Sequence, residues 1–169
     1  MKKETMIELI KYIIIILVVV LIRTFIITPV KVNGSSMYNT LENNEIMILN
    51  KLKYRVSSIK RFDIVVVNAD NDKLIKRVIG LPGETIEYKD EKLYINGKYI
   101  KDKYAYSKTN DFSLEDIGLK KLPKNCYFVM GDNRSNSKDS RYFGCVDRKD
   151  ILGSANLVLF PFSKIGYKK

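Results

Sequence analysis

The sequence has one long run of apolar residues, close to its amino terminus. Residues 12–22 read YIIIILVVVLI, between Lys11 and Arg23. The run alone is too short to cross a bilayer, but a helix from Met6 to Ile27 would have about 22 residues and a length of roughly 33 Å. That length spans the hydrocarbon core when Lys11 and Arg23 extend their charged ends to the two interfaces. Because the run has no polar face, it fits a membrane helix better than the core helix of a soluble domain.

We expect this segment to stay in the protein as a signal-anchor. A cleaved signal peptide ends in small residues at its cleavage site, whereas this chain continues RTFIITPVKVNG. Lys2, Lys3 and Lys11 precede or begin the helix, and positive charge favours the cytoplasmic side. Residues 1–27 are therefore predicted to form a cytoplasmic tail and one helix in the cell membrane, with residues 28–169 on the outer face.

After residue 28 the pattern changes to short runs rich in β-branched and aromatic residues. These runs are EIMILNK, DIVVVNA, KLIKRVIG, ETIEYK, KLYING, CYFVMG and NLVLF. Asn96-Gly97 is a hairpin signal and Leu81-Pro82-Gly83 is a turn signal. Near residues 89–124 the long apolar runs disappear and Lys and Tyr become frequent, which indicates a smaller inserted region. The pattern predicts a mainly β domain behind the amino-terminal helix.

Composition and charge narrow the possible chemistry. The apolar and charged shares, 46% and 29%, are typical of a globular domain rather than a disordered chain. The net charge of +11 makes an anionic partner worth considering, either nucleic acid or a membrane surface. Histidine is absent, which excludes Ser-His-Asp triads, Cys-His dyads and HExxH zinc sites. Any acid or base must then be Lys, Asp, Glu, Tyr or Cys.

The two cysteines, Cys126 and Cys145, match none of the usual cysteine motifs. They are too few for a disulfide scaffold and too far apart for a CxxC redox or metal site. We interpret them as small buried apolar side chains, and the sequence leaves open whether they pair.

Two segments combine hydroxyl or basic side chains with a defined backbone pattern. Residues 34–41, GSSMYNTL, follow the membrane helix closely, although a Gly-Ser-Ser run by itself is more often a plain turn. In KLIKRVIG, residues 73–80, strand alternation places Lys76 on one face with Leu74 and Val78, and Arg77 on the other. One basic side chain is thus expected to enter apolar surroundings. Burial lowers the pKa of lysine whereas arginine stays protonated, so only Lys76 can become a base. On this segment alone, an edge strand with both charges in solvent is the more common arrangement, because most lysines are exposed.

A third segment, GDNRSNSKDSR at residues 131–141, concentrates acids, bases, amides and hydroxyls. A calcium loop is excluded, because Arg134 occupies the third ligand position after Asp132 and no glycine follows Asn136. Composition alone favours a solvated loop, and the functional alternative is that its hydroxyls and paired charges orient a neighbouring lysine. RFDIVVV, residues 61–67, is interpreted as a core strand whose start is capped by Asp63.

Four motifs follow the membrane helix in a fixed order: GSSMxxTL, RFDIVVV, IKRVIGLPGE and GDNRSNSKDSRYFG. In this order they resemble the motifs of the bacterial type I signal peptidases (leader peptidases), the membrane serine proteases of family S26. The resemblance extends to GSANLVLFPF near the end and leaves residues 89–124 weakly matched. It implies that Ser36 is the nucleophile and Lys76 the general base.

The same resemblance assigns supporting positions and partners. Ser137 matches a hydroxyl that holds the lysine, Asp139 and Arg141 match a structural ion pair, and Asp132 matches the acid that opens the last motif. The implied substrates are secretory pre-proteins with small residues before the cleavage site, cut at the lipid bilayer. Neither a metal nor a cofactor is implied, and nucleic acid is not expected as a partner.

The implied mechanism places a physical demand on Lys76, which must be neutral to act as a base. Moving its pKa from about 10.4 to about 8 or below requires roughly 3 kcal/mol, which burial beside Leu74 and Val78 can supply. Ser36 would then attack the scissile carbonyl, Lys76 would carry the proton to the leaving amine, and water would release the acyl group.

Three positions depart from the family pattern. Asn39 stands where the family usually has proline and is expected to loosen the turn that presents Ser36. Phe62 replaces a usual glycine and is assigned to packing. Gly34 replaces a serine that helps the oxyanion hole in some members, so oxyanion stabilisation should rest on backbone N–H groups such as that of Ser36.

Two other classes of function remain alternatives. One is a membrane-anchored basic module that binds lipid headgroups or nucleic acid without catalysis. The other is a self-cleaving Ser-Lys repressor of the LexA kind, which would need a helix-turn-helix where residues 1–27 offer a membrane segment. Both rank below the peptidase interpretation.

Overall fold

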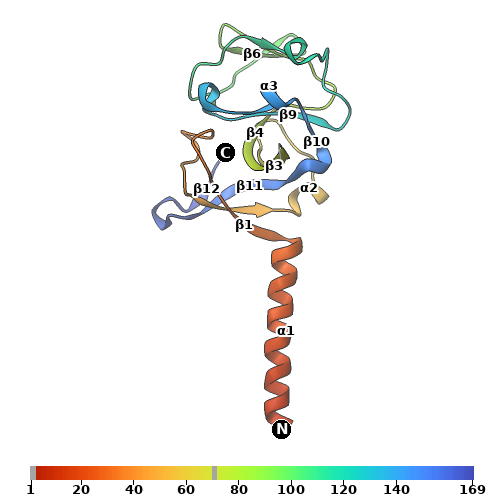
Figure 1. The fold of residues 1–169 in the computed structure, drawn as a ribbon, viewed down its shortest axis with the longest axis vertical. Coiled ribbons are helices and arrows are strands. Elements are labelled where there is room, and N and C mark those ends of the chain that lie inside the picture. The colour runs from red at the N-terminus through yellow and green to blue at the C-terminus, as the bar shows by residue number, and fades with distance from the viewer. Residues whose placement is uncertain (1–2, 70–71) are drawn as a thin grey trace.

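The structure, a computed structural model, describes residues 3–69 and 72–169 (Figure 1). A long helix, α1 (Lys3–Phe25), projects from a β-rich domain. Within residues 4–25, an 18-residue window reaches a mean hydropathy of 2.7 and is not buried by the rest of the protein. The helix is therefore long and apolar enough to cross a membrane, as the sequence pattern predicted. It ends two residues before the predicted limit, because Ile27 already pairs as part of the first strand.

The larger sheet is antiparallel and follows directly from α1. Its order is β1-β2-β11-β3-β4-β9-β10, with β12 added to β11. The strands are β1 (Ile27–Lys31), β2 (Ile46–Asn50), β3 (Ile64–Ala69), β4 (Asp72–Gly80), β9 (Cys126–Met130), β10 (Val146–Asp147), β11 (Ile151–Phe160) and β12 (Gly166–Tyr167). Short helices connect them: α2 (Lys53–Val56), α3 (Ser140–Phe143) and the 3-10 turns η2 (Arg134–Asn136), η3 (Arg148–Asp150) and η4 (Phe162–Lys164). The prediction of a mainly β domain is confirmed.

A second, four-stranded sheet packs against the end of β4, at the side of the domain opposite α1 (Figure 1). It comprises β5 (Ile86–Lys89), β6 (Lys92–Ile95), β7 (Lys98–Ile100) and β8 (Phe112–Ser113), followed by the 3-10 turn η1 (Leu114–Ile117). The Asn96-Gly97 hairpin forms as predicted, with both residues in the left-handed region that such a turn requires. Gly80 allows the close approach of the two sheets, because a Cβ there would overlap Ile86 and Leu122.

β4 lies between β3 and β9 in the larger sheet, and apolar clusters cover both of its faces. Ile79 packs with Phe128 and the second sheet, whereas Val78 packs with Val65 and Val129. Any side chain on the carboxyl-terminal half of β4 is consequently buried, whichever face it occupies.

The interpretation of the two cysteines as small buried apolar side chains is wrong, because both are only half-buried and they are joined to each other. Cys126, at the start of β9, and Cys145, just before β10, form a disulfide with a Cα–Cα separation of 5.7 Å. Antiparallel pairing of β9 with β10 brings the two residues together. A spacing of 19 residues gave no indication of this pairing, which the strand register decides.

Candidate active site

Ser36 lies in the loop between β1 and β2, held by buried neighbours on its carboxyl side. Met37 and Leu41 are both buried in the core of the larger sheet. The N–H groups of Thr40 and Leu41 donate to the Met37 carbonyl at 2.9 and 2.8 Å. Backbone hydrogen bonds therefore close the turn, and the loosening expected from Asn39 stays a prediction. Ser36 itself stays partly exposed.

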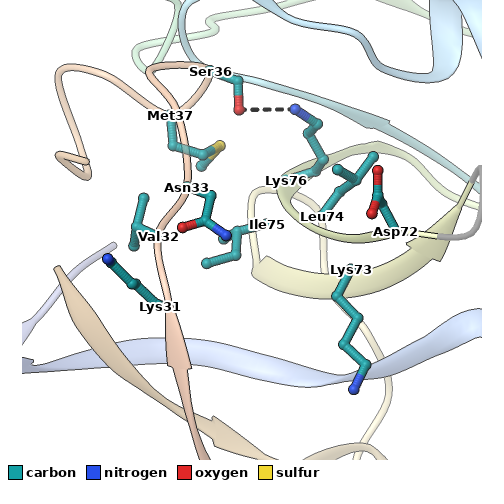
Figure 2. A pocket seen from close by; sticks show the side chains of 10 residues that line it. All are labelled: Lys31, Val32, Asn33, Ser36, Met37, Asp72, Lys73, Leu74, Ile75 and Lys76. Carbon is teal, nitrogen blue, oxygen red and sulfur yellow. Dashed lines mark hydrogen bonds between the residues drawn. The ribbon is translucent and has the colours of Figure 1, made fainter. Parts of the chain in front are cut away.

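Lys76 reaches this serine from β4 (Figure 2). Its Nζ donates to Ser36 Oγ at 2.9 Å and to Ser137 Oγ at 3.1 Å, and the residue is 3% exposed. Burial lowers the pKa of Lys76 to about 8, opposed in part by the negative charges of Asp139 and Asp132. A substantial neutral fraction therefore exists at mildly alkaline pH, in line with the demand derived from the sequence.

The structure buries Arg77 as well as Lys76, where the sequence predicted that one basic side chain would enter apolar surroundings. Arg77 is fully buried and bonds both carboxylate oxygens of Asp132, at 2.8 and 2.7 Å. Its Nη1 donates to the carbonyl of Phe62, whose φ of 70° explains why a glycine suits that position. Both faces of β4 are covered, so each basic residue requires its own polar partner.

The segment 131–141 is folded and largely buried, not a solvated loop as its composition favoured. Asp139 caps α3, accepts the N–H of Gly131, and pairs with Arg141 Nε at 2.8 Å. This arrangement places the Ser137 hydroxyl beside Lys76. The expected ion pair of Asp139 and Arg141 thus forms, and Asp139 lies two residues after Ser137 along the chain.

The segment 131–141 also forms hydrogen bonds to the loop that carries Ser36. Asp132 accepts a hydrogen bond from Thr40 Oγ1 at 2.5 Å, and the N–H of Asn133 donates to the Ser36 carbonyl at 2.9 Å. Gly131 allows this approach, because a Cβ there would overlap both the Ser36 carbonyl oxygen and Ser137 Oγ. Sequence reasoning missed Thr40, Asn133 and the pairing role of Arg77. Their only sequence signal was that each lies in one of the four motifs: GSSMxxTL, GDNRSNSKDSRYFG and IKRVIGLPGE respectively.

A cleft of about 180 Å³ opens beside the pair, between the loop after β1 and the amino-terminal half of β4 (Figure 2). Its apolar lining comes from Val32, Met37, Leu74 and Ile75. Residues 72–76 pair with β3 on one side, whereas the pairing of β4 with β9 begins at Arg77. Their other backbone edge therefore faces the cleft and is available to an extended peptide.

Backbone donors beside Ser36 differ in availability. The N–H of Gly34 donates to Asn43 Oδ1 at 2.9 Å, which removes it from the cleft. The N–H of Ser36 has no acceptor among the residues that the structure describes. Over those same residues no group of three or more His, Cys, Asp or Glu side chains is arranged to hold a metal ion.

Comparison with known proteins gives consistent matches. The sequence profile of a family described as signal peptidase, peptidase S26, matches residues 6–160. The chain is 45% identical to signal peptidase I P of Bacillus subtilis subsp. natto, with 99% of this chain and 96% of the relative aligned. It is 42% identical to signal peptidase I S of Bacillus subtilis strain 168, covering 97% and 94%. A crystal structure of a signal peptidase I from Enterococcus faecalis V583 is 38% identical, has a TM-score of 0.55, and covers 59% of this chain and 97% of its own.

Proposed function

The chain belongs to the signal peptidase family, peptidase S26, and we propose that it removes amino-terminal signal peptides from exported pre-proteins with a Ser36–Lys76 dyad. The observation that carries this assignment is the 2.9 Å contact between Ser36 Oγ and a buried lysine whose pKa lies at about 8. In a chain without histidine, this pair supplies the nucleophile and the base.

The reaction proceeds in two stages. Ser36 Oγ attacks the scissile carbonyl carbon while neutral Lys76 Nζ takes the hydroxyl proton. The lysine then protonates the leaving amine, the C–N bond breaks, and an ester on Ser36 remains. Water attacks this ester with Lys76 again accepting the proton, which releases the signal peptide as a carboxylic acid and regenerates the serine. The N–H of Ser36, which has no acceptor among the described residues, would stabilise the oxyanion of both tetrahedral intermediates.

The cleft supports a preference for small residues before the cut. A peptide paired with the free edge of residues 72–76 would direct alternate side chains into the lining of Val32, Met37 and Ile75. The volume of about 180 Å³ would be shared by all the peptide residues that enter the cleft, which leaves a small share for each side chain.

Anchoring by α1 supports action at the membrane. We propose that the amino terminus is cytoplasmic and that residues 28–169 form the peptidase domain on the outer face, where signal peptides emerge. The basic binding module and the self-cleaving repressor are not favoured, because the family profile covers the membrane helix and the catalytic motifs together.

The decisive experiment uses the purified full chain in detergent with a secretory pre-protein. Ser36→Ala and Lys76→Ala should each lower processing by at least a thousandfold, because nucleophile and base act as a unit. Lys76→Arg should fail equally, since a guanidinium keeps its proton. Product is quantified on gels, and sequencing of its new amino terminus locates the cut. Lys98→Ala, an exposed lysine of β7, is the control and should process normally. Substantial cleavage by Ser36→Ala, Lys76→Ala or Lys76→Arg would refute the dyad.

A further inference from the structure

A second cavity, distinct from the cleft, lies where the β domain meets the membrane helix. It has a volume of about 370 Å³ and is lined by β1, β2, α2, β4, η3 and β11. Four basic residues contribute to its wall: Lys51, Arg55, Lys73 and Arg148. None of the described lining residues is Asp or Glu. The cavity thus concentrates positive charge without a matching acid.

The hydrogen bonds of these basic residues leave their charges uncompensated. Lys51 Nζ donates to the carbonyl of Thr24 at 2.8 Å, and Arg148 donates to the carbonyls of Tyr54 at 2.6 Å and Ile151 at 3.4 Å. These acceptors are neutral. Within residues 3–69 and 72–169, Arg55 and Lys73 form no ion pair.

The acid that bonds to α2 does not supply the missing charge. Asp63, which follows α2 along the chain, is engaged by Lys53 at 3.2 Å and by Tyr54 Oη at 2.9 Å. The Arg148 guanidinium lies over the ring of that tyrosine, 5.9 Å from its centroid. An anion entering the cavity would therefore meet several donors and no competing carboxylate from the lining.

The depth of the cavity follows from its contacts with the last turn of α1. Thr28, which lines the cavity, donates to the carbonyl of Arg23 at 2.9 Å, and Lys51 bonds the next carbonyl, that of Thr24. The span from Glu4 to Phe25 measures roughly 33 Å, about the thickness of the hydrocarbon core. The end of α1, and the cavity with it, therefore lies at the level of the headgroups.

α2 fits the same level. It sits at the end of the β domain from which α1 emerges (Figure 1). Val56, next to Arg55, is 86% exposed, the largest exposed fraction among the large apolar side chains that the structure describes. An apolar side chain beside a cationic one is typical of a surface that meets lipid.

We propose that the cavity lined by Lys51, Arg55, Lys73 and Arg148 binds the phosphate of an anionic phospholipid headgroup. The proposal rests on membrane anchoring by α1 as part of the proposed function, and not on the peptidase chemistry. A bound headgroup would prevent the β domain from rotating about the end of α1. The cleft would then keep a constant height above the bilayer, where the substrate is held by its own apolar segment.

The test measures lipid retention by the full chain, carrying Ser36→Ala so that no cleavage occurs. Native mass spectrometry is applied to protein in micelles that contain equal amounts of phosphatidylglycerol and phosphatidylcholine with the same acyl chains. We expect one phosphatidylglycerol to be retained in preference. Arg55→Gln combined with Lys73→Gln should weaken this preference about 25-fold, since each basic side chain near an anionic surface contributes about fivefold. Lys73 also borders the cleft, but its side chain points away from the Ser36–Lys76 pair (Figure 2).

The matched control is Lys98→Gln combined with Lys101→Gln, which removes the same charge from two exposed positions, one in β7 and one just after it, and should retain the preference. Equal retention of both lipids, or an equal loss in both double variants, would overturn the proposal. A third arm measures thermal unfolding of the protein with phosphatidylglycerol and, separately, with inorganic phosphate in place of the lipid. Equal protection by the two would assign the site to free phosphate instead. Arg55→Gln alone, at an exposed position, provides a second variant if the double one unfolds. Because lipid retention needs no cleavage, its failure and the failure of the dyad proposal are seen separately.

Discussion

Two adjacent residues of β4 show how one strand treats two buried positive charges differently. Arg77 receives the carboxylate of Asp132 and remains charged. Lys76 receives two hydroxyl oxygens, which accept hydrogen bonds but carry no charge. Burial then lowers the pKa of Lys76, because nothing in direct contact neutralises the ammonium. The chemical difference between base and structural cation follows from these partners.

The cleavage rate should depend on pH through Lys76. With a pKa of about 8 against an ordinary value of 10.5, the neutral base fraction rises with pH, so kcat/KM should climb through an apparent pKa of about 8. The measurement is the rate on a soluble peptide from about pH 5 to about pH 10. Leu74→Asn should move the rising limb to higher pH, whereas Leu74→Met should not. A limb in the carboxylate range, or one unmoved by Leu74→Asn in a folded protein, would contradict a desolvated lysine base.

The same pKa shift links Lys76 to stability. Between about pH 8 and 10.5 the unfolded chain keeps a lysine proton that the folded chain has lost, so the free energy of unfolding should rise with pH in this window. Lys76→Met should remove that rise, which is roughly 3 kcal/mol in full. Urea titrations of both proteins at several pH values measure it. Parallel curves for the two proteins would mean that the pKa of Lys76 is not lowered in the folded state.

Ser137 is a positioning residue, and its loss should weaken catalysis without abolishing it. Its Oγ lies 3.1 Å from Lys76 Nζ, so Ser137→Ala should lower kcat about tenfold, the worth of one hydrogen bond. Ser137→Thr, which keeps the hydroxyl, should restore much of the rate. Pre-steady-state cleavage assays compare the three proteins. Unchanged kcat in Ser137→Ala would remove this hydroxyl from the site.

At the scale of elements, the stretch between β7 and β8 bonds to the segment 131–141, which carries Ser137. Asp102 pairs with the buried Arg134 at 2.5 Å, and the N–H of Tyr106 donates to the carbonyl of Asp132 at 2.8 Å. Burial alone would raise the pKa of Asp102, but the positive charge of Arg134 outweighs it and holds the pKa below its usual value. Residues 89–124, which match the family pattern only weakly, thus contact the segment 131–141 that carries Asp132 and Arg134.

Asp102→Asn should therefore lower the stability of the protein, although Asp102 is not part of the Ser36–Lys76 pair. Leaving Arg134 charged, buried and without its carboxylate should lower the free energy of unfolding by about 3 kcal/mol, measured by urea denaturation. Asp111→Asn is the control, because Asp111 is exposed and bonds one backbone N–H, that of Asp90. Equal effects of the two substitutions would show that the buried pair adds nothing to stability.

At the scale of the whole molecule, α1 and the β domain are joined by direct hydrogen bonds as well as by chain continuity. The bonds of Lys51 and Thr28 to the last carbonyls of α1 tie the start of the β domain to the end of this helix. The side of the membrane that we propose rests on charge at the amino end, where Lys2, Lys3 and Lys11 favour the cytoplasm.

Protease added to intact protoplasts should accordingly digest residues 28–169 and spare an epitope tag at the amino terminus. Immunoblotting with antibodies to the tag and to the β domain follows both parts. A cytoplasmic protein monitored in the same samples verifies that the protoplasts stayed closed. Digestion of the tag with protection of the β domain would reverse the proposed orientation.

Local patterns were enough to predict the membrane helix, the mainly β domain and the Asn96-Gly97 turn, whereas the burial of Lys76 was expected only once the motifs were compared with a family. Each of the first three depends on neighbours in sequence: an unbroken apolar run, alternation along a strand, or a residue pair that tolerates left-handed backbone. The candidate dyad came from the order of the motifs, and its geometry in the structure supports the roles proposed for Ser36 and Lys76.

Contacts between distant segments were decided by the fold. The disulfide depends on the register of β9 with β10, and the burial of Arg77 depends on layers that cover both faces of β4. The bond from Asn133 to the Ser36 carbonyl and the ion pair of Arg134 with Asp102 join residues that no local pattern connects. A sequence reports which side chains prefer burial, but which charge meets which partner is settled when sheets and loops pack together.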